Sequence, residues 1–326
     1  MKRRHNTRHL SRVCIVLTLV SACVLLLAGC LDGTSEPAGS ATTAPTSPSP
    51  GSTGEESFYE LRDLAVTPDG MAWAATGDGL MRLESEGWER VLEDTEVNAL
   101  AGAPDDSLWV GVGCEVQRFD GGAWETVFPC GEHLPRGNIL DIAFTPDGAA
   151  WIANGFRLAS FDGHEWTTYD RLVNSLVVAP DGALWVNGWE GTQGSSYVAR
   201  FDGENWTTFK GAHSFPGGFL VGAVTPDGLL WGTIPDSRLA SFDGQSWGDE
   251  RSWTPYSRAD GLPLDEALTL AVAPDGALWV GTSSGAARFD GAWTVYVAGE
   301  AVRAIAFGRQ GDVWLDTTVV RPAGAE

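Results

Sequence analysis

The sequence has few positive charges: 21 Lys and Arg stand against 43 Asp and Glu, and five of the basic residues precede an apolar segment near the N-terminus. Without residues 1–29 the chain carries 16 basic and 43 acidic residues, a formal charge of −27. Such a charge repels nucleic acid and anionic headgroups and favours cations or basic partners. We therefore expect no nucleic-acid partner.

Cysteine is also scarce, with five residues in 326. Cys14, Cys23 and Cys30 belong to the N-terminal segment, so only Cys114 and Cys130 remain for a folded part. In an oxidising compartment two remaining cysteines are expected to pair. We predict a disulfide between Cys114 and Cys130; the alternative is two unbonded thiols packed as small apolar groups.

Motifs for catalysis, metals and cofactors are missing. No His-x-x-x-His or Cys-x-x-Cys spacing occurs, and no nucleophile-base pair, paired-carboxylate motif or cofactor loop is evident. Outside residues 1–29 the histidines are His133, His164 and His213, of which His133 and His213 are placed where a general base or metal ligand would sit. We predict no catalytic residue, no metal site and no cofactor.

The N-terminus has the features of an export signal: basic residues followed by the apolar run Val13–Ala28. The run ends in Leu27-Ala28-Gly29-Cys30, which resembles a bacterial lipobox. We predict a lipoprotein signal peptide at residues 1–29 and lipidation of Cys30. The alternative is an uncleaved membrane anchor, for which the run is barely long enough.

Residues 30–54 contain the lipidated cysteine and a linker rich in Ser, Thr, Pro and Gly, a composition that does not bury enough apolar surface to fold. We predict a flexible tether that holds the domain of residues 55–326 on the extracytoplasmic face of a bacterial cell membrane.

One unit is repeated through that domain and is most complete at Ala271–Tyr296. Four short apolar stretches are separated by turn residues, among them Pro274-Asp275-Gly276, where Asp-Gly suits a tight hairpin. Seven copies follow one another at spacings of roughly 34 to 48 residues, the range of propeller blades. The counterpart turns begin at Pro68, Pro104, Pro146, Pro180, Pro226 and, in degenerate form, Arg309.

These repeats predict an all-β, seven-bladed β-propeller with four-stranded antiparallel blades; six or eight blades remain open. The last copy lacks its fourth strand, and Ser57-Phe58-Tyr59-Glu60 aligns with outer-strand sequence elsewhere. We predict that this N-terminal strand completes the last blade, which removes the free sheet edges. Thirteen of the 15 tryptophans are repeat residues, for which we predict packing between blades.

The repeat carries a family likeness. The run WTPYSRADGLPLDEALTLAVAPDGALWVGTSSGAARFDGAW, from Trp253, resembles the two-component regulator propeller repeat, and the likeness extends from about Phe58 to Arg321. This resemblance implies an extracytoplasmic sensor, which in that family usually adjoins a membrane helix and a histidine kinase. The sequence ends at Glu326, so we expect any signal to pass to a separate partner.

A weaker likeness connects the chain with streptogramin lyases, which are also seven-bladed propellers. That resemblance implies a catalytic histidine and a magnesium site, but we find no match to the catalytic pattern of those lyases in this sequence.

Polar residues interrupt the innermost strand of several repeats. They fall six or five residues before the turn proline, or at the equivalent place in the last copy: Arg62, Asp63, Asn98, Asp141, Asn174 and Arg303. We predict that they surround one mouth of the central channel and contact a ligand; the alternative is that they bond to one another or to water. Trp189 lies outside the repeat register and is a candidate stacking or interaction residue.

Together these features favour a non-catalytic module that binds a ligand or a protein and is anchored to the membrane through its N-terminal lipid. A sensory role is one version of this function. We expect a monomer with an unidentified ligand or envelope protein partner. The alternative is a cell-envelope propeller enzyme, a lyase or hydrolase with its site on the loop-rich face.

Overall fold

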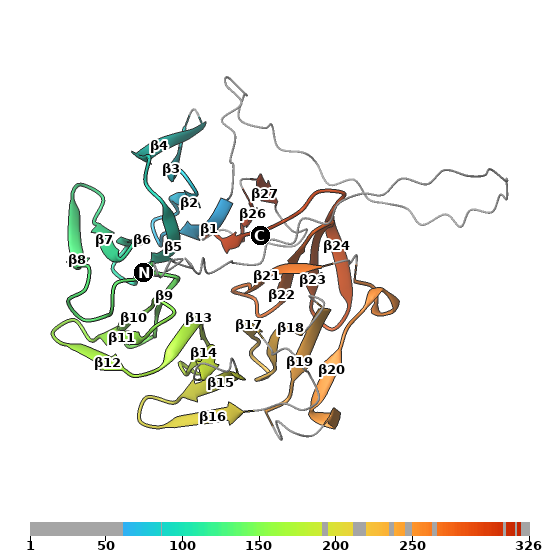
Figure 1. The fold of residues 1–326 in the computed structure, drawn as a ribbon. Helices are drawn as coiled ribbons and strands as arrows, with labels where there is room; N and C mark the ends of the chain where they lie inside the picture. Colours follow the sequence, from blue (N-terminus) through green and yellow to red (C-terminus); the bar gives the residue numbers. More distant parts are fainter. Residues whose placement is uncertain are drawn as a thin grey trace, which may run out of the picture. The chain divides into compact units, whose positions relative to one another are not determined.

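Figure 1 shows a computed structural model of the chain. It describes residues 61–85, 87–190, 195–210, 220–234, 238–244, 250–262, 266–308, 311–316 and 318–320. The described residues all belong to one unit of the chain, Thr46–Glu326. The predicted signal peptide, Cys30, the linker and the closing strand 57–60 lie outside the described residues. Within those residues, no helix has the length and apolar character to cross a membrane.

Seven small antiparallel sheets are arranged in a ring (Figure 1), which confirms the predicted seven-bladed β-propeller. Six sheets have four strands, and three strands of the seventh are described. In each sheet the strands follow one another in chain order, the first lying nearest the ring axis.

The strands fall into four sets by their position in the blade. The innermost strands are β1 (Leu61–Val66), β5 (Val97–Gly102), β9 (Asp141–Phe144), β13 (Leu172–Val178), β17 (Leu220–Val224), β21 (Ala267–Val272) and β25 (Ile305–Phe307). The second strands are β2 (Ala72–Thr76), β6 (Leu108–Val112), β10 (Ala150–Ala153), β14 (Leu184–Glu190), β18 (Leu230–Ile234), β22 (Leu278–Thr282) and β26 (Val313–Leu315). The third strands are β3 (Gly79–Glu84), β7 (Glu115–Phe119), β11 (Leu158–Phe161), β15 (Ser195–Phe201), β19 (Arg238–Phe242), β23 (Gly285–Phe289) and β27 (Thr318–Val320). The outer strands are β4 (Gly87–Glu93), β8 (Trp124–Phe128), β12 (Trp166–Tyr169), β16 (Trp206–Lys210), β20 (Trp253–Pro255) and β24 (Trp293–Ala298). Two short 3₁₀ helices, η2 (Glu250–Ser252) and η3 (Arg258–Asp260), flank β20.

The inner strands of blades 1 to 6 run into turns that begin with Pro-Asp, and we name that end of the blades the lower end and the opposite end the upper end. In blade 1 the turn is held by Asp69, whose Oδ1 accepts hydrogen bonds from the Thr67 hydroxyl at 2.6 Å and the Met71 N–H at 3.1 Å. Gly70 has a φ of 94°, a conformation that glycine adopts without strain. The aspartate therefore serves to shape its own turn.

Blades 1 and 7 are neighbours, so the ring closes within the described residues. Strand β1 packs against β25, and Leu64 and Met81 of blade 1 share a buried cluster with Trp314 of blade 7. The rings of Trp88 and Trp314 meet edge to face, with centroids 6.0 Å apart.

The first tryptophan of every blade is buried, which confirms the predicted packing role of these residues. They are Trp73, Trp109, Trp151, Trp185, Trp231, Trp279 and Trp314. In blade 5 the outer strand begins at Trp253, which pairs with Phe242 of β19. The hydrophobic core consequently lies between successive blades and not at the upper or lower ends of the ring.

Candidate functional site

The upper ends of the inner strands of blades 1 to 4, 6 and 7 carry one structurally equivalent position. Its occupants in the described side chains are Arg62, Asn98, Leu140, Asn174, Leu268 and Arg303. In blades 1, 2, 4 and 6 this residue is the extra residue of a β-bulge, where the pairing register of the first two strands shifts. Bulges commonly turn a side chain away from the sheet and recur beside binding sites.

Arg62 is engaged by neighbouring residues of blade 2. Its Nη1 lies 2.5 Å from Glu96 Oε1 and also donates to Asn98 Oδ1. The Nδ2 of Asn98 is buried and has no hydrogen-bond partner among the described residues. Arg62, Glu96 and Asn98 thus form one polar group across blades 1 and 2, in which the Asn98 Nδ2 donor remains unsatisfied by the described residues.

Asp63 connects the same two blades through the backbone. Its Oδ2 accepts a hydrogen bond from the Leu100 N–H of blade 2 at 2.7 Å, and its Oδ1 accepts one from its own neighbour, the Leu64 N–H. Asp141 repeats this arrangement between blades 3 and 4, where its Oδ2 accepts from the Leu176 N–H at 2.7 Å. Both carboxyl groups therefore join the edge of one inner strand to the next.

Burial raises the pKa of both carboxyl groups. For Asp63 the rise is from 3.8 to about 6, opposed by the hydrogen bonds from Leu100 and Leu64. For Asp141 burial raises the pKa to about 7, the bond from Leu176 opposes the rise, and the charge of Asp63 adds to it. The two carboxyl groups are therefore close enough for the ionisation of one to disfavour that of the other.

These pKa values predict a pH-dependent stability. Each of the two carboxyl groups has a higher pKa in the folded protein than the value of about 3.9 expected in the unfolded chain. The stability that each group contributes is therefore fully present below about pH 4 and is lost as the pH rises through about 6 to 7. Between about pH 5 and about pH 8, the free energy of unfolding of the wild type should fall relative to that of Asp141→Asn by on the order of 2 kcal/mol. Urea unfolding at constant ionic strength measures the difference.

The surface variant Asp170→Asn controls for the change of one net charge, because the Asp170 side chain is almost fully exposed. Parallel stability profiles for the wild type and Asp141→Asn would contradict the assigned role of burial.

Asn174 and Arg303 occupy the equivalent position in blades 4 and 7. Asn174 lies beside Gly155 and Leu140 at the top of blade 3, and the Gly155 N–H donates to the Val173 carbonyl at 2.9 Å. Arg303 is exposed, and its backbone N–H donates to Asp316 Oδ1 at 2.7 Å. The structure thus gathers the six predicted channel residues at the upper ends of the inner strands, whereas Trp189 lies at the end of β14, 40% exposed.

Three exposed apolar residues at the upper ends are absent from the sequence prediction: Leu140, Phe156 and Leu268. Leu140 and Leu268 each stand six residues before a turn proline, so the repeat register places them with the polar residues. The sequence prediction covers only the polar residues at this position, because an apolar residue in a strand gives no local signal that it is exposed. Phe156 lies in the turn between β10 and β11, and its ring lies against Gly137, where a Cβ would come within 2.6 Å of it.

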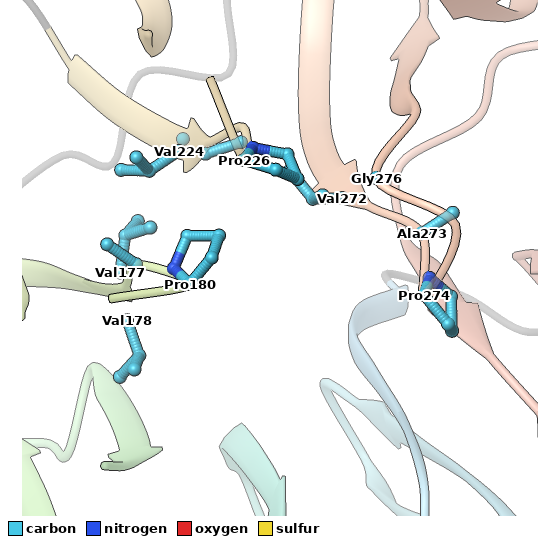
Figure 2. Close-up of a pocket in the computed structure, with 12 residues that line it drawn as sticks. Val177, Val178, Pro180, Val224, Pro226, Val272, Ala273, Pro274 and Gly276 are labelled. Atoms are coloured by element: carbon cyan, nitrogen blue, oxygen red, sulfur yellow. The ribbon is translucent and has the colours of Figure 1, made fainter. Parts of the chain in front are cut away.

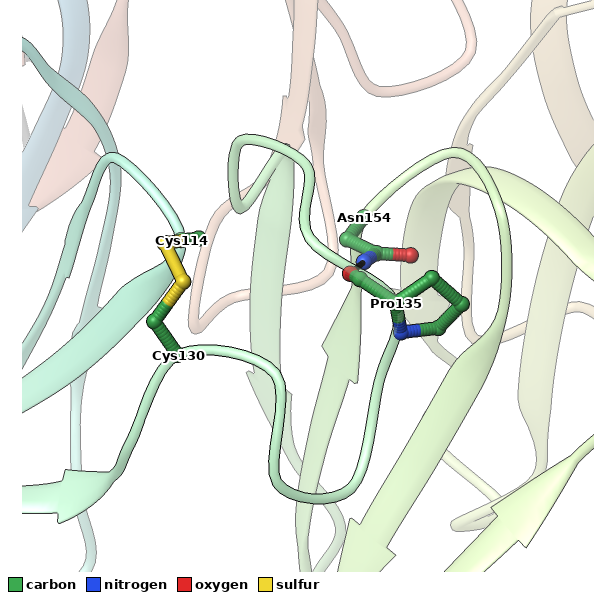
Figure 3. Close-up of a disulfide and its surroundings, with 4 residues drawn as sticks. All are labelled: Cys114, Cys130, Pro135 and Asn154. Atoms are coloured by element: carbon green, nitrogen blue, oxygen red, sulfur yellow. Dashed lines mark hydrogen bonds between the residues drawn. A yellow bond between two sulfur atoms is a disulfide. The ribbon is translucent and has the colours of Figure 1, made fainter.

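The loop that carries Gly137 is fastened at several points (Figure 3). The predicted disulfide is present, with the Cα atoms of Cys114 and Cys130 5.0 Å apart. Beyond it, Asn154 Nδ2 of blade 3 donates to the Pro135 carbonyl at 2.7 Å. The disulfide and this bond hold the loop against the upper ends of blades 2 and 3.

His133 belongs to the same loop and has a packing role there. Its ring stacks on Trp166 with centroids 5.4 Å apart and lies 5.6 Å from Phe128. His164 is in a lower turn, and His213 lies outside the described residues. Among the described residues, no group of three or more His, Cys, Asp or Glu has the arrangement of a metal site.

No family model matches the chain, and no curated protein matches it. Several solved structures, however, are similar to the chain in fold. A streptogramin B lyase superposes with a TM-score of 0.61 at 15% identity, covering 80% of this chain and 91% of the lyase. YCF48 bound to a D1 peptide superposes with a TM-score of 0.58 at 16% identity, covering 79% of this chain and 90% of that chain.

A third similar structure is the extracellular domain of a putative hybrid two-component system from B. thetaiotaomicron. Its TM-score is 0.58 at 12% identity, with 80% of this chain and 37% of that chain covered. At these identities the likeness establishes a β-propeller, a fold whose neighbours here include both an enzyme and a domain of a signalling system.

Proposed function

We propose that this protein is a lipid-anchored, extracytoplasmic β-propeller that binds a ligand or a protein partner at its upper end without turning it over. The signal-like N-terminus and Cys30 support the anchoring. The protein acts as a sensor if binding at the upper end passes a signal to a separate envelope protein.

The observation that carries the proposal is the distribution of exposed apolar side chains. Of the six large ones in the described part of the chain, four lie at the upper ends of blades: Leu140, Phe156, Trp189 and Leu268. They accompany the polar ring positions occupied by Arg62, Asn98, Asn174 and Arg303. Exposed apolar residues rimmed by polar ones are typical of interaction surfaces.

The arrangement of the ionisable groups supports binding over catalysis. The ring of His133 is stacked on Trp166, and Asp63 and Asp141 each hold the backbone of two blades together. A peptide complex of a similar propeller is known for YCF48, which supports a protein or peptide as the occupant here.

The test is a binding screen followed by surface variants. The full chain is first screened by thermal shift against sugars, peptidoglycan fragments, small anions and divalent metals, and envelope partners are captured by crosslinking at the position of Phe156. Whatever binds should do so about tenfold more weakly with Phe156→Ala or Trp189→Ala, because exposed aromatic residues dominate interface energies. Val295→Ala, an equally exposed residue of outer strand β24, is the matched control. Binding that none of the upper-end variants weakens would refute the proposal.

The alternative is an envelope enzyme, a lyase or hydrolase with acid-base groups at the upper end. The raised pKa values of Asp63 and Asp141 favour it, since such shifts concentrate at catalytic sites. Turnover that depends on a metal and disappears on replacing His133 or His213 would establish the enzyme. Stoichiometric capture that is indifferent to those histidines supports the binding module.

A further inference from the structure

The lower end of the ring contains a cavity of about 380 Å³ between blades 4, 5 and 6 (Figure 2). Its walls are formed by residues of β13, β17 and β21 and by the turns that follow these strands. Every lining residue is a valine, an alanine, a proline or a glycine, so the lining contains no charged side chain and no side chain that forms hydrogen bonds. A volume of this size is suited to a small organic molecule.

The position two residues before the turn proline has a valine in all three of these blades. The valines line the cavity: Val178, Val224 and Val272. The flanking blades 3 and 7 have phenylalanine at the equivalent register, Phe144 and Phe307. The ring of Phe144 meets that of Trp109 in blade 2 edge to face, with centroids 5.2 Å apart. Blades 4 to 6 therefore present less side-chain volume at this level than the blades on either side of them.

Backbone groups of the lining are used by hydrogen bonds within the turns. The Ala179 N–H donates to the Ala183 carbonyl, and the Ala179 carbonyl accepts from the Gly182 N–H, both at 2.8 Å. Ala273 forms the equivalent two bonds in blade 6, at 2.9 Å and 2.8 Å. The lining prolines have no N–H to donate. A charged ligand would therefore lose its hydration in the cavity without gaining equivalent partners.

We propose that this cavity binds a small, uncharged and apolar molecule of one or two hydrocarbon rings. The ligand packs among the valine and proline side chains, and the removal of apolar surface from water stabilises the complex. The lining disfavours ions of either sign, because it contains no side chain that would pair with them. Since the site is at the opposite end of the ring from the upper surface, it stands or falls independently of the proposed function.

Three probes that share one ring test the proposal on the full chain: para-fluorotoluene, para-fluorobenzylamine and para-fluorobenzoate. Each is titrated to millimolar concentration in sealed tubes and followed by fluorine NMR. Para-fluorotoluene should bind saturably, and each ion should bind at least about fivefold more weakly, because its charge finds no partner in the lining. Absence of saturable binding by para-fluorotoluene, or binding of either ion that is equally tight or tighter, overturns the proposal.

Valine-methyl NMR locates the bound probe without changing the cavity. The methyl resonances of Val178, Val224 and Val272 should shift as para-fluorotoluene is added. Those of Val66 should stay unchanged, because Val66 has the same register in blade 1 and does not belong to the lining. Shifts confined to valines outside the lining would refute the assignment of the cavity.

Val178→Phe and Val272→Phe should each weaken binding of para-fluorotoluene at least about fivefold, since the added ring takes up apolar space that the ligand needs. Blades 3 and 7 carry phenylalanine at this register, so we expect the fold to accept both changes. Val66→Phe is the matched control and should leave binding unchanged. Circular dichroism and the unfolding midpoint check that each variant is folded. Unchanged binding in a folded Val178→Phe or Val272→Phe variant, or an equal loss in Val66→Phe, contradicts the site.

Discussion

Replacing Trp231 by alanine should lower the free energy of unfolding by about 3–5 kcal/mol, the range for deleting a large aromatic side chain from a core. Trp231 is 1% exposed and lies between blades 5 and 6. Its ring is 4.9 Å from that of Tyr256 in its own blade and 5.5 Å from that of Phe289 in the next. Truncation removes both contacts and leaves a cavity that the surrounding sheets fill only partly.

A hydrogen bond adds to this effect. Trp231 Nε1 donates to the Thr225 hydroxyl at 2.9 Å, beside the turn of blade 5. Trp231→Phe retains much of the volume but loses that donor, so it should cost less than the alanine variant. The difference between the two variants separates packing from hydrogen bonding.

Trp189→Ala is the control for loss of an indole without loss of core. Trp189 is 40% exposed, and its removal should change the free energy of unfolding by less than about 1 kcal/mol. Equilibrium urea unfolding, monitored by far-ultraviolet circular dichroism, measures all three variants. A cost for Trp231→Ala no greater than that for Trp189→Ala would contradict the view that the blades are held together by buried tryptophan.

Loss of the disulfide should lower the free energy of unfolding by about 3 kcal/mol, the value expected for a closed loop of this size. Cys114 follows β6 and Cys130 follows β8, 16 residues later. The bond restricts the unfolded chain, and in the folded chain it lies beside the loop that carries His133 and meets Phe156. The double variant Cys114→Ala/Cys130→Ala should therefore be less stable and should expose that loop to limited proteolysis.

Reduction provides the matched measurement for the disulfide. Dithiothreitol should destabilise the wild type by a similar amount and leave the double variant unchanged. Thiol titration of the unfolded, unreduced domain should find no free thiol at positions 114 and 130. Reactive thiols at both positions, together with a wild type insensitive to reductant, would contradict the bond.

Much of the fold follows from local features of the sequence. The Pro-Asp-Gly turns and the tryptophan after each of them depend on a few neighbouring residues, and repetition of these residues gives the number of blades. The pairing of Cys114 with Cys130 also follows from counting, since no other cysteine remains for the folded part. The sequence likewise places Arg62, Asn98 and Asn174 at one level, because each stands six residues before its turn proline.

The contacts of these polar residues do not follow from local features. Asp63 accepts a hydrogen bond from Leu100, 37 residues away, and Asp141 from Leu176, 35 residues away. Their carboxyl groups became part of the joints between blades because closing the ring brings one inner strand beside the next. The ion pair between Arg62 and Glu96 has the same origin, since the two residues come from neighbouring blades.

The sequence by itself determined the class of fold, the blade repeat, the disulfide partners and the level at which the polar residues lie, because each of these depends on residues near one another or on a count. Only the tertiary structure decided which neighbour each polar group meets and where apolar side chains remain exposed. The physical reason is that burial and pairing depend on surfaces brought together from different blades, and the spacing of residues along the chain does not specify how those surfaces meet.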